Sequence, residues 1–321
     1  MLVARRATLA AVAAIVLAGP ASAQDQPLVA VTAIVEHPAL DATRDGVKEA
    51  LAAEGFVDGK TITFVYESAQ GSPATAVQIA RRFVGEAPAV IVPISTPSAQ
   101  AVAAATQDIP VVFSSVTDPV GAKLVTNREH PGGNVTGMSN MSPIGKHLDL
   151  VQEILPSLKR LGVIHNPGEV NSRTLVGMLK AEAPVRGIAI VEAPASKSSD
   201  VQAAAQSLVG RVDAVYVPTD NTVVSAFEAL VQVGRQNKLP VIAGDIDSVP
   251  RGAIAAVGFN YTDVGRQTGR MVARVLRGER PGDIPVEQAQ TLELAVNPAA
   301  AEAMGVTLPE ALVARADIVV R

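Results

Sequence analysis

The 321-residue sequence contains no cysteine and no tryptophan, and aromatic residues make up only 3% of it. Without cysteine the chain has no disulfide framework, no cysteine nucleophile and no thiol that could carry a lipid anchor. Sugar sites depend on aromatic platforms, so the low aromatic content argues against a carbohydrate ligand. A binding site in this chain is therefore expected to be built from other side chains.

Sequence signatures of common enzyme classes are also absent. There is no Gly-x-Ser-x-Gly elbow, no Gly-x-Gly-x-x-Gly turn and no Walker loop. The four histidines, His37, His130, His147 and His165, have no metal-ligand spacing. We therefore predict no catalytic residue, no metal site and no cofactor, with an enzyme on an α/β scaffold as an alternative. His130 and His147 are expected at the surface.

The N-terminus has the pattern of an export signal. Arg5 and Arg6 precede an apolar run over residues 7–17 and small residues at 21–23. The apolar run is too short to span a bilayer, which favours a signal peptide over residues 1–23 rather than a membrane anchor. Its removal leaves 25 basic residues against 31 acidic ones, a net charge near −6. With this negative charge, nucleic acid is not an expected partner. The export signal predicts a soluble protein of the periplasm.

The mature chain contains a similar pattern twice. In residues 27–120 four apolar strands alternate with helical segments, and residues 160–249 repeat the same order. Two copies of a βα pattern predict an α/β protein with two Rossmann-like lobes, each holding a parallel sheet. Polar residues follow the C-terminal end of each strand, where open parallel sheets bind ligands. The binding site is therefore expected in a cleft between the lobes.

The remaining segments predict how the two lobes are joined. A helix is expected over residues 262–276, where Gly265 and Gly269 permit close packing, and Tyr261 before it can line the cleft. We expect a hinge of three segments, near residues 135–142, 257–261 and 287–291. The predicted division is an N-terminal lobe of residues 24–137 plus about 261–288, and a C-terminal lobe of residues 138–257 plus about 291–321.

Short hydroxyl, amide and acidic side chains collect at the strand ends of both copies. The candidates for ligand binding are His37, Ser95, Thr96, Ser114 and Ser115 in the first copy, and Asn166, Asn171, Thr219, Asp220, Asn221 and Asp245 in the second. Hydroxyls and free helix N-terminal amides suit a carboxylate. A buried carboxylate such as Asp220 suits an ammonium, because a buried charge needs an opposite partner. This division predicts a site for an α-amino acid.

A plainer interpretation treats these residues as helix caps and turn formers. Ser72, Thr96 and Asp220 stand where N-cap residues are expected. His37 and Asn166 occupy equivalent positions, each directly before a proline, and either can be a turn former.

Several motifs follow one another in order: Glu36-His37-Pro38, Ser95-Thr96-Pro97, Thr117-Asp118-Pro119, Pro131-Gly132-Gly133-Asn134, Asn166-Pro167-Gly168-Glu169, Pro218-Thr219-Asp220-Asn221 and Gly265-Arg266-Gln267-Thr268-Gly269. Together they resemble the ABC-transporter substrate-binding family, whose better-known members are tryptophan- and tyrosine-binding proteins. The resemblance spans essentially the whole mature chain and implies a type I periplasmic-binding-protein fold. It also implies that the ligand lies between Ser95, Thr96, Ser114 and Ser115 on one side and Asn166, Asn171, Thr219, Asp220 and Asp245 on the other.

These observations predict a monomeric periplasmic solute-binding protein. Its expected role is to deliver an amino acid, aromatic if the resemblance extends to the ligand side chain, to an inner-membrane ABC permease. An extracytoplasmic sensor that reports its ligand to a membrane kinase or chemoreceptor is the alternative. A cytoplasmic repressor is disfavoured, because a signal peptide rather than a helix-turn-helix precedes the first strand.

Overall fold

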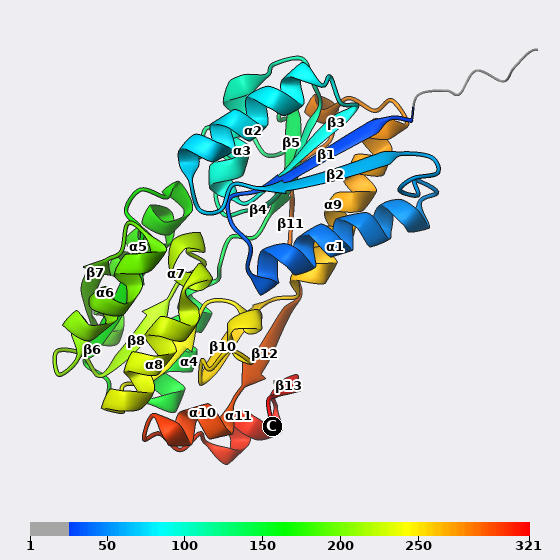
Figure 1. Ribbon diagram of the computed structural model, residues 1–321. Helices are drawn as coiled ribbons and strands as arrows, with labels where there is room; N and C mark the ends of the chain where they lie inside the picture. Colours follow the sequence, from blue (N-terminus) through cyan, green and yellow to red (C-terminus); the bar gives the residue numbers. More distant parts are fainter. Residues whose placement is uncertain (1–25) are drawn as a thin grey trace, which may run out of the picture.

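The computed structural model describes residues 26–321, in two lobes that each hold a sheet flanked by helices (Figure 1). The predicted signal peptide, residues 1–23, lies outside the described residues. Within residues 26–321, no helix combines the length and the apolar character needed to cross a membrane.

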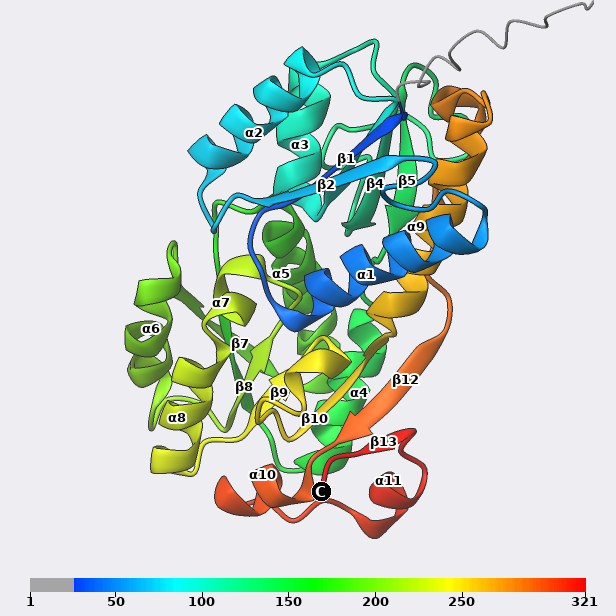
Figure 2. The ribbon, with the colours of Figure 1, turned by 45° about the vertical axis from the view of Figure 1, so that its right-hand side comes forward.

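The first lobe is built on a six-stranded sheet. Its strands are β1 (Leu28–Ala33), β2 (Thr63–Ser68), β3 (Val90–Ile94), β4 (Val111–Val116), β5 (Val135–Ser139) and β11 (Glu287–Gln288). They run in the order β11-β5-β4-β3-β1-β2, and every neighbouring pair is parallel. Because the strands are parallel, their C-terminal ends share one edge, and this edge faces the second lobe (Figure 2).

The helices of the first lobe are α1 (Pro38–Ala53), α2 (Pro73–Gly85), α3 (Thr96–Ala105) and α9 (Tyr261–Leu276). α2 and α3 cover one face of the sheet, and α1 and α9 cover the other (Figure 2). α9 confirms the predicted helix and its close packing, since a Cβ atom on Gly265 would lie 2.1 Å from the carbonyl oxygen of Thr43 in α1. The Ser72 cap is also confirmed, because its hydroxyl accepts a hydrogen bond from Thr75 N at 3.2 Å.

The second lobe holds a seven-stranded sheet. Its strands are β6 (Arg160–His165), β7 (Ala189–Pro194), β8 (Ala214–Val217), β9 (Val241–Ala243), β10 (Ala255–Phe259), β12 (Leu292–Val296) and β13 (Ile318–Val319). They run in the order β13-β12-β10-β9-β8-β6-β7. β12 pairs with β10 antiparallel while the other pairs are parallel, so the sheet is not wholly parallel as predicted.

The helices of the second lobe are α4 (Ile144–Ile154), α5 (Val170–Glu182), α6 (Val201–Leu208), α7 (Asn221–Ser225), α8 (Phe227–Asn237), α10 (Pro298–Ala303) and α11 (Glu310–Ala314). α4 packs with α5, and α6 packs with α8 (Figure 2). Short 3₁₀ turns lie at Pro184–Arg186, Ser198–Asp200 and Ile246–Ser248, and a fourth, Pro281–Asp283, packs on β5 in the first lobe. Each lobe has an apolar core of its own.

The chain passes between the two sheets three times. The crossings are residues 140–143 between β5 and α4, Asn260 between β10 and α9, and residues 289–291 between β11 and β12. They fall in or directly beside the three segments predicted to form the hinge. We propose that the lobes divide at these crossings, because the predicted limits at 137 and 257 lie within β5 and β10.

The prediction that His147 lies at the surface is wrong. Its side chain is buried on the inner face of α4, and its Nδ1 atom lies 2.5 Å from the hydroxyl oxygen of Tyr216. Burial lowers the pKa of His147 to about 4, so the ring is neutral near pH 7. The helical period, rather than the polarity of the neighbouring Lys146, decides which face of α4 is buried. His130 is exposed in an irregular segment, as expected.

Candidate functional site

The start of α3 supplies one wall of the site. Ser95 stands at the N-cap with a left-handed φ of +80°, and Thr96 is the first helical residue rather than the cap that the sequence predicted. Neither side chain caps the helix, and the Thr96 hydroxyl is buried without a hydrogen-bond partner. A non-glycine residue in this conformation stores strain, a common feature of functional sites. The free hydroxyl and helix amides suit an anionic group.

At the end of β4 the side chains of two adjacent serines point in different directions. The register between β4 and β5 shifts there, and Ser115 has a left-handed φ of +53°. Ser114 is turned into the lobe, where its hydroxyl lies 2.6 Å from that of Thr268. Ser115 faces the cleft, with its hydroxyl 3.2 Å from that of Thr43. Irregularities of this kind turn a side chain toward a binding site.

Asp220 anchors the opposite wall, where β6 and β8 end. Its carboxylate caps α7 by accepting a hydrogen bond from Val223 N at 2.9 Å, and it accepts a second from Asn166 N at 2.5 Å. Asp220 therefore ties together two loops of the second lobe. The Asp220 cap predicted from the sequence is confirmed.

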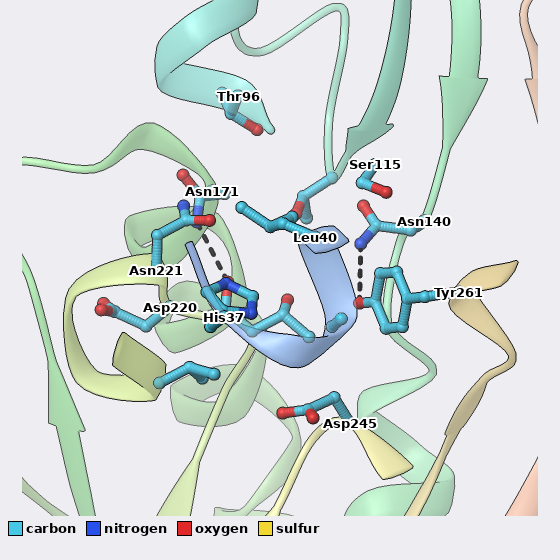
Figure 3. Close-up of a pocket in the computed structure, with 14 residues that line it drawn as sticks. His37, Leu40, Thr96, Ser115, Asn140, Asn171, Asp220, Asn221, Asp245 and Tyr261 are labelled. Carbon is cyan, nitrogen blue, oxygen red and sulfur yellow. Dashed lines mark hydrogen bonds between the residues drawn. The ribbon is translucent and has the colours of Figure 1, made fainter. Parts of the chain in front are cut away.

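Asp245 lines the bottom of the site in Figure 3, and Asn140 and Tyr261, beside the crossings, line its right-hand side. Asp245 follows β9 and accepts hydrogen bonds from Ser248 N and the Ser248 hydroxyl, both at 2.9 Å. At the hinge, Asn140 Nδ2 donates a hydrogen bond to Tyr261 Oη at 3.0 Å. Asn140 Oδ1 is buried and has no partner.

These elements enclose one pocket between the lobes (Figure 3). It is lined by His37, Ala39, Leu40, Thr96, Ser115, Thr117, Asn140, Asn171, Thr219, Asp220, Asn221, Val224, Asp245 and Tyr261. Its cavity has a volume of about 20 Å³, which is room for about one water molecule. A larger ligand can enter only when the two lobes move apart.

The electrostatics of the pocket favour a cation at the second lobe. Asp220 and Asp245 line it, and no lysine or arginine does. Burial, together with the nearby Glu169 carboxylate, raises the pKa of Asp220, and burial raises the pKa of Asp245. Burial lowers the pKa of His37 to about 3, so this ring stays neutral. An ammonium group bound here would therefore offset the negative charge of the buried Asp220 and Asp245 carboxylates.

The structure brings together eight of the eleven predicted binding residues: His37, Thr96, Ser115, Asn171, Thr219, Asp220, Asn221 and Asp245. Ser95, Ser114 and Asn166 are not among the lining residues. Asn166 forms a turn, with its Oδ1 accepting from Gly168 N and its Nδ2 donating to Thr222 Oγ1, both at 2.8 Å. Ligand contact by any of these residues stays a prediction.

Two residues that shape the site, Asn140 and Glu169, were not among the predicted binding residues. Asn140 was assigned only to a hinge segment, and Glu169 only to a motif. Glu169 lies directly behind the pocket and accepts hydrogen bonds from Asn171 and Asn221. Glu169 stands at the N-cap of α5 but makes no capping hydrogen bond, so no helix-capping pattern in the sequence points to its role. Among residues 26–321, no group of three or more histidine, aspartate or glutamate side chains is placed to hold a metal.

The comparison with known families decides the identity of the chain. The model of the family described as ABC transporter substrate binding protein matches residues 28–320. The chain belongs to this family. It is 42% identical over 272 residues to the tyrosine-binding protein of Clostridioides difficile strain R20291, a match that covers 85% of this chain and 79% of that protein. The resemblance stated from the motifs is therefore confirmed.

Two solved structures of this family's fold are informative. The ABC domain from Streptococcus pneumonia in complex with L-Trp is 31% identical, covers 92% of this chain and 100% of its own, and superposes with a TM-score of 0.89. A substrate binding protein with adhesive properties from Clostridium difficile, in a ligand-free, open structure, is 39% identical, covers 92% and 99%, and gives a TM-score of 0.69. The predicted type I periplasmic-binding-protein fold is confirmed.

Proposed function

We propose that this substrate-binding protein is exported to the periplasm, where as a monomer it closes on an L-amino acid with an aromatic side chain and delivers it to an inner-membrane ABC permease. The observation that carries the proposal is the division of chemistry across the pocket. Thr96 and Ser115 line it with hydroxyl groups from the first lobe, and Asp220 and Asp245 line it with acidic side chains from the second. A zwitterion matches both walls only when the lobes close on it. The family binds substrates, and we assign no reaction to this chain.

The rest of the pocket supports an aromatic side chain. Leu40, Val224 and the ring of Tyr261 offer apolar contact, while Asn140 and Asp245 offer oxygen acceptors in the same pocket. A ring that carries a hydrogen-bond donor, such as a phenol or an indole, fits this mixture. The C. difficile relative named for tyrosine and the S. pneumonia structure with L-Trp support the same class of ligand.

We infer that the present structure is the closed form. It superposes better on the L-Trp complex, at a TM-score of 0.89 with 31% identity, than on the open, ligand-free structure, at 0.69 with 39% identity. Divergence of sequence alone would give the opposite order, so a difference in lobe arrangement is the better explanation. The small space left in the pocket agrees with this inference.

A thermal-unfolding screen of the refolded mature protein tests the ligand class. L-Tyrosine, L-tryptophan, L-phenylalanine, L-leucine, citrate and glucose would be compared at equal concentration. A ligand at one hundred times its dissociation constant stabilises the folded state by about 2.7 kcal/mol. We expect this effect with L-tyrosine or L-tryptophan and a smaller one with L-phenylalanine. Stabilisation by citrate or glucose alone would contradict the proposal.

Uptake in cells tests the transport role. Deleting the gene should abolish high-affinity uptake of the radiolabelled amino acid identified in the screen, and the wild-type gene should restore it. Unchanged uptake together with a lost chemotactic or kinase response to that amino acid would favour a sensor instead.

A further inference from the structure

Glu169 is a buried carboxylate just outside the pocket. It stands at the N-cap of α5 and is 7% exposed. One of its oxygens, Oε2, accepts hydrogen bonds from Asn171 Nδ2 at 3.0 Å, from Asn221 N at 3.2 Å and from Asn221 Nδ2 at 2.5 Å. The other, Oε1, accepts from Thr222 N at 3.1 Å and from Thr222 Oγ1 at 2.8 Å. These donors lie in the first turns of α5 and α7, and Asp220 is the N-cap residue of α7.

The charge of Glu169 determines how these amides are oriented. An ionised carboxylate accepts hydrogen bonds and cannot donate them, so an amide beside it must present its nitrogen. Asn171 Nδ2 is held by Glu169 and also donates to the carbonyl oxygen of Thr219 at 3.1 Å. Asn171 Oδ1 is therefore left on the pocket side, buried and without a partner.

No lysine, arginine or histidine among residues 26–321 forms an ion pair with Glu169. The charge is instead stabilised by the five hydrogen bonds from Asn171, Asn221 and Thr222. The side chain makes no capping bond to α5, so its effect is to tie the start of α5 to the start of α7. The same hydrogen bonds leave Asn171 Oδ1 without a partner in the pocket wall that Asp220 also lines (Figure 3).

We propose that Glu169 is a positioning residue for recognition of the ligand ammonium, because it holds Asn171 with its oxygen toward the pocket beside Asp220. This inference rests on the proposed amino-acid ligand. Glu169 does not contact the ligand in this arrangement. A glutamine at the same position can donate a hydrogen bond to Asn171 Oδ1, which allows the amide to turn and present its NH₂ group to the ammonium.

The test compares two ligands that differ only in the amino group. L-Tyrosine and 3-(4-hydroxyphenyl)propionate would be titrated by calorimetry into wild-type protein and the Glu169→Gln variant. We expect the variant to bind L-tyrosine at least about tenfold more weakly, because a hydrogen bond to a charged group is lost. Its affinity for the propionate should stay within about threefold of wild type, since that ligand has no ammonium. Glu182→Gln, at the other end of α5, is the matched control and should leave both affinities unchanged.

A second variant keeps the proposal testable if Glu169→Gln fails to fold. Asn171→Ala removes the oriented oxygen and should reduce the preference for L-tyrosine over the propionate in the same way. If either folded variant weakens both ligands equally, or leaves the preference unchanged, the positioning role is overturned while amino-acid binding stands. If wild-type protein does not bind L-tyrosine or any other amino acid, the proposed function fails, and this inference fails with it.

Discussion

The side-chain amide of Asn140 donates a hydrogen bond to the hydroxyl of Tyr261 at 3.0 Å. Asn140 begins the first crossing between the lobes, and Tyr261 directly follows the second. Both residues line the pocket. This bond therefore connects the pocket wall to two of the three crossings between the lobes.

Replacing Tyr261 by phenylalanine removes this connection. The variant should be less stable by about 1 kcal/mol, because Asn140 Nδ2 is left buried without its acceptor. Ligand affinity should fall about fivefold to tenfold, because the crossings are held less firmly in the closed arrangement. Calorimetry and thermal unfolding measure the two effects. Tyr66→Phe, on β2 and away from the pocket, is the control, and an equal loss of affinity there would contradict the prediction.

Replacing Asp220 by asparagine should abolish measurable binding of an amino acid while the protein still folds. The ammonium loses its charge partner, which costs at least about a hundredfold in affinity. Asparagine retains one oxygen for the Val223 or Asn166 amide, so the loss of stability should stay near 1–2 kcal/mol. Titration calorimetry and circular dichroism measure the two outcomes.

Asp213 offers a matched control for Asp220. Its carboxylate also accepts two backbone hydrogen bonds, from Lys159 N at 2.8 Å and Arg160 N at 2.7 Å, but it does not line the pocket. Asp213→Asn should reduce stability and leave affinity unchanged. Wild-type affinity in Asp220→Asn would remove Asp220 from the site.

Asp220 also gives the unliganded protein a pH dependence of defined sign. Its pKa is raised in the folded state by burial and by Glu169, so above about pH 4 the folded state binds a proton that the unfolded chain releases. Its contribution to the free energy of unfolding therefore falls as pH rises from about 4 through the raised pKa. His37 and His147, with pKa values lowered to about 3 and about 4, act in the opposite direction below about pH 6.5.

Because these groups oppose each other, the pH prediction concerns the difference between two proteins. The melting temperature of Asp220→Asn relative to wild type should rise between pH 5 and pH 8, since only wild type must ionise the buried carboxyl. Asp213 has a lowered pKa, so Asp213→Asn should differ from wild type by a constant amount over this range. A constant difference for Asp220→Asn as well would show that its pKa is not raised.

Close packing of α1 and α9 makes Gly265 intolerant of a larger side chain. A Cβ atom there would lie 2.1 Å from the carbonyl oxygen of Thr43, so Gly265→Ala must push the helices apart. We expect a loss of about 2–4 kcal/mol in the free energy of unfolding. Gly177→Ala in α5 is the control, because nothing lies within 4 Å of its Cβ position, and it should be neutral or stabilising. Urea unfolding of both variants decides the matter.

The fold could be predicted largely because its signals are local and repeated. Strand and helix periods, glycines at the α1–α9 contact and polar residues after each strand are all visible in the sequence. The Asp220 cap belongs to this class. The single antiparallel pair of β10 and β12 does not, because strand direction depends on the path of the chain rather than on residue type.

The parts of the site that sequence could not predict depend on backbone detail. Ser114 and Ser115 are adjacent and chemically identical, and only the irregularity at the end of β4 sends one inward and the other to the pocket. The side chain of His147 is polar yet buried, because Tyr216 supplies a partner from another element. Asn140 reaches the pocket through the path of a crossing. Each outcome is set by tertiary contacts that no local pattern encodes.

The pairing of α1 with α9 affects when the molecule can complete its folding. The ion pair between Glu49 of α1 and Arg266 of α9 joins positions 217 residues apart. A contact between residues so far apart in the sequence forms slowly, because a long loop must be closed before the two residues can meet. During synthesis α1 therefore emerges early and keeps an apolar face uncovered until Leu276 has been added. A chain released before that point would expose this apolar face to other chains. Truncated products are therefore expected to aggregate rather than to fold into a protein with altered binding.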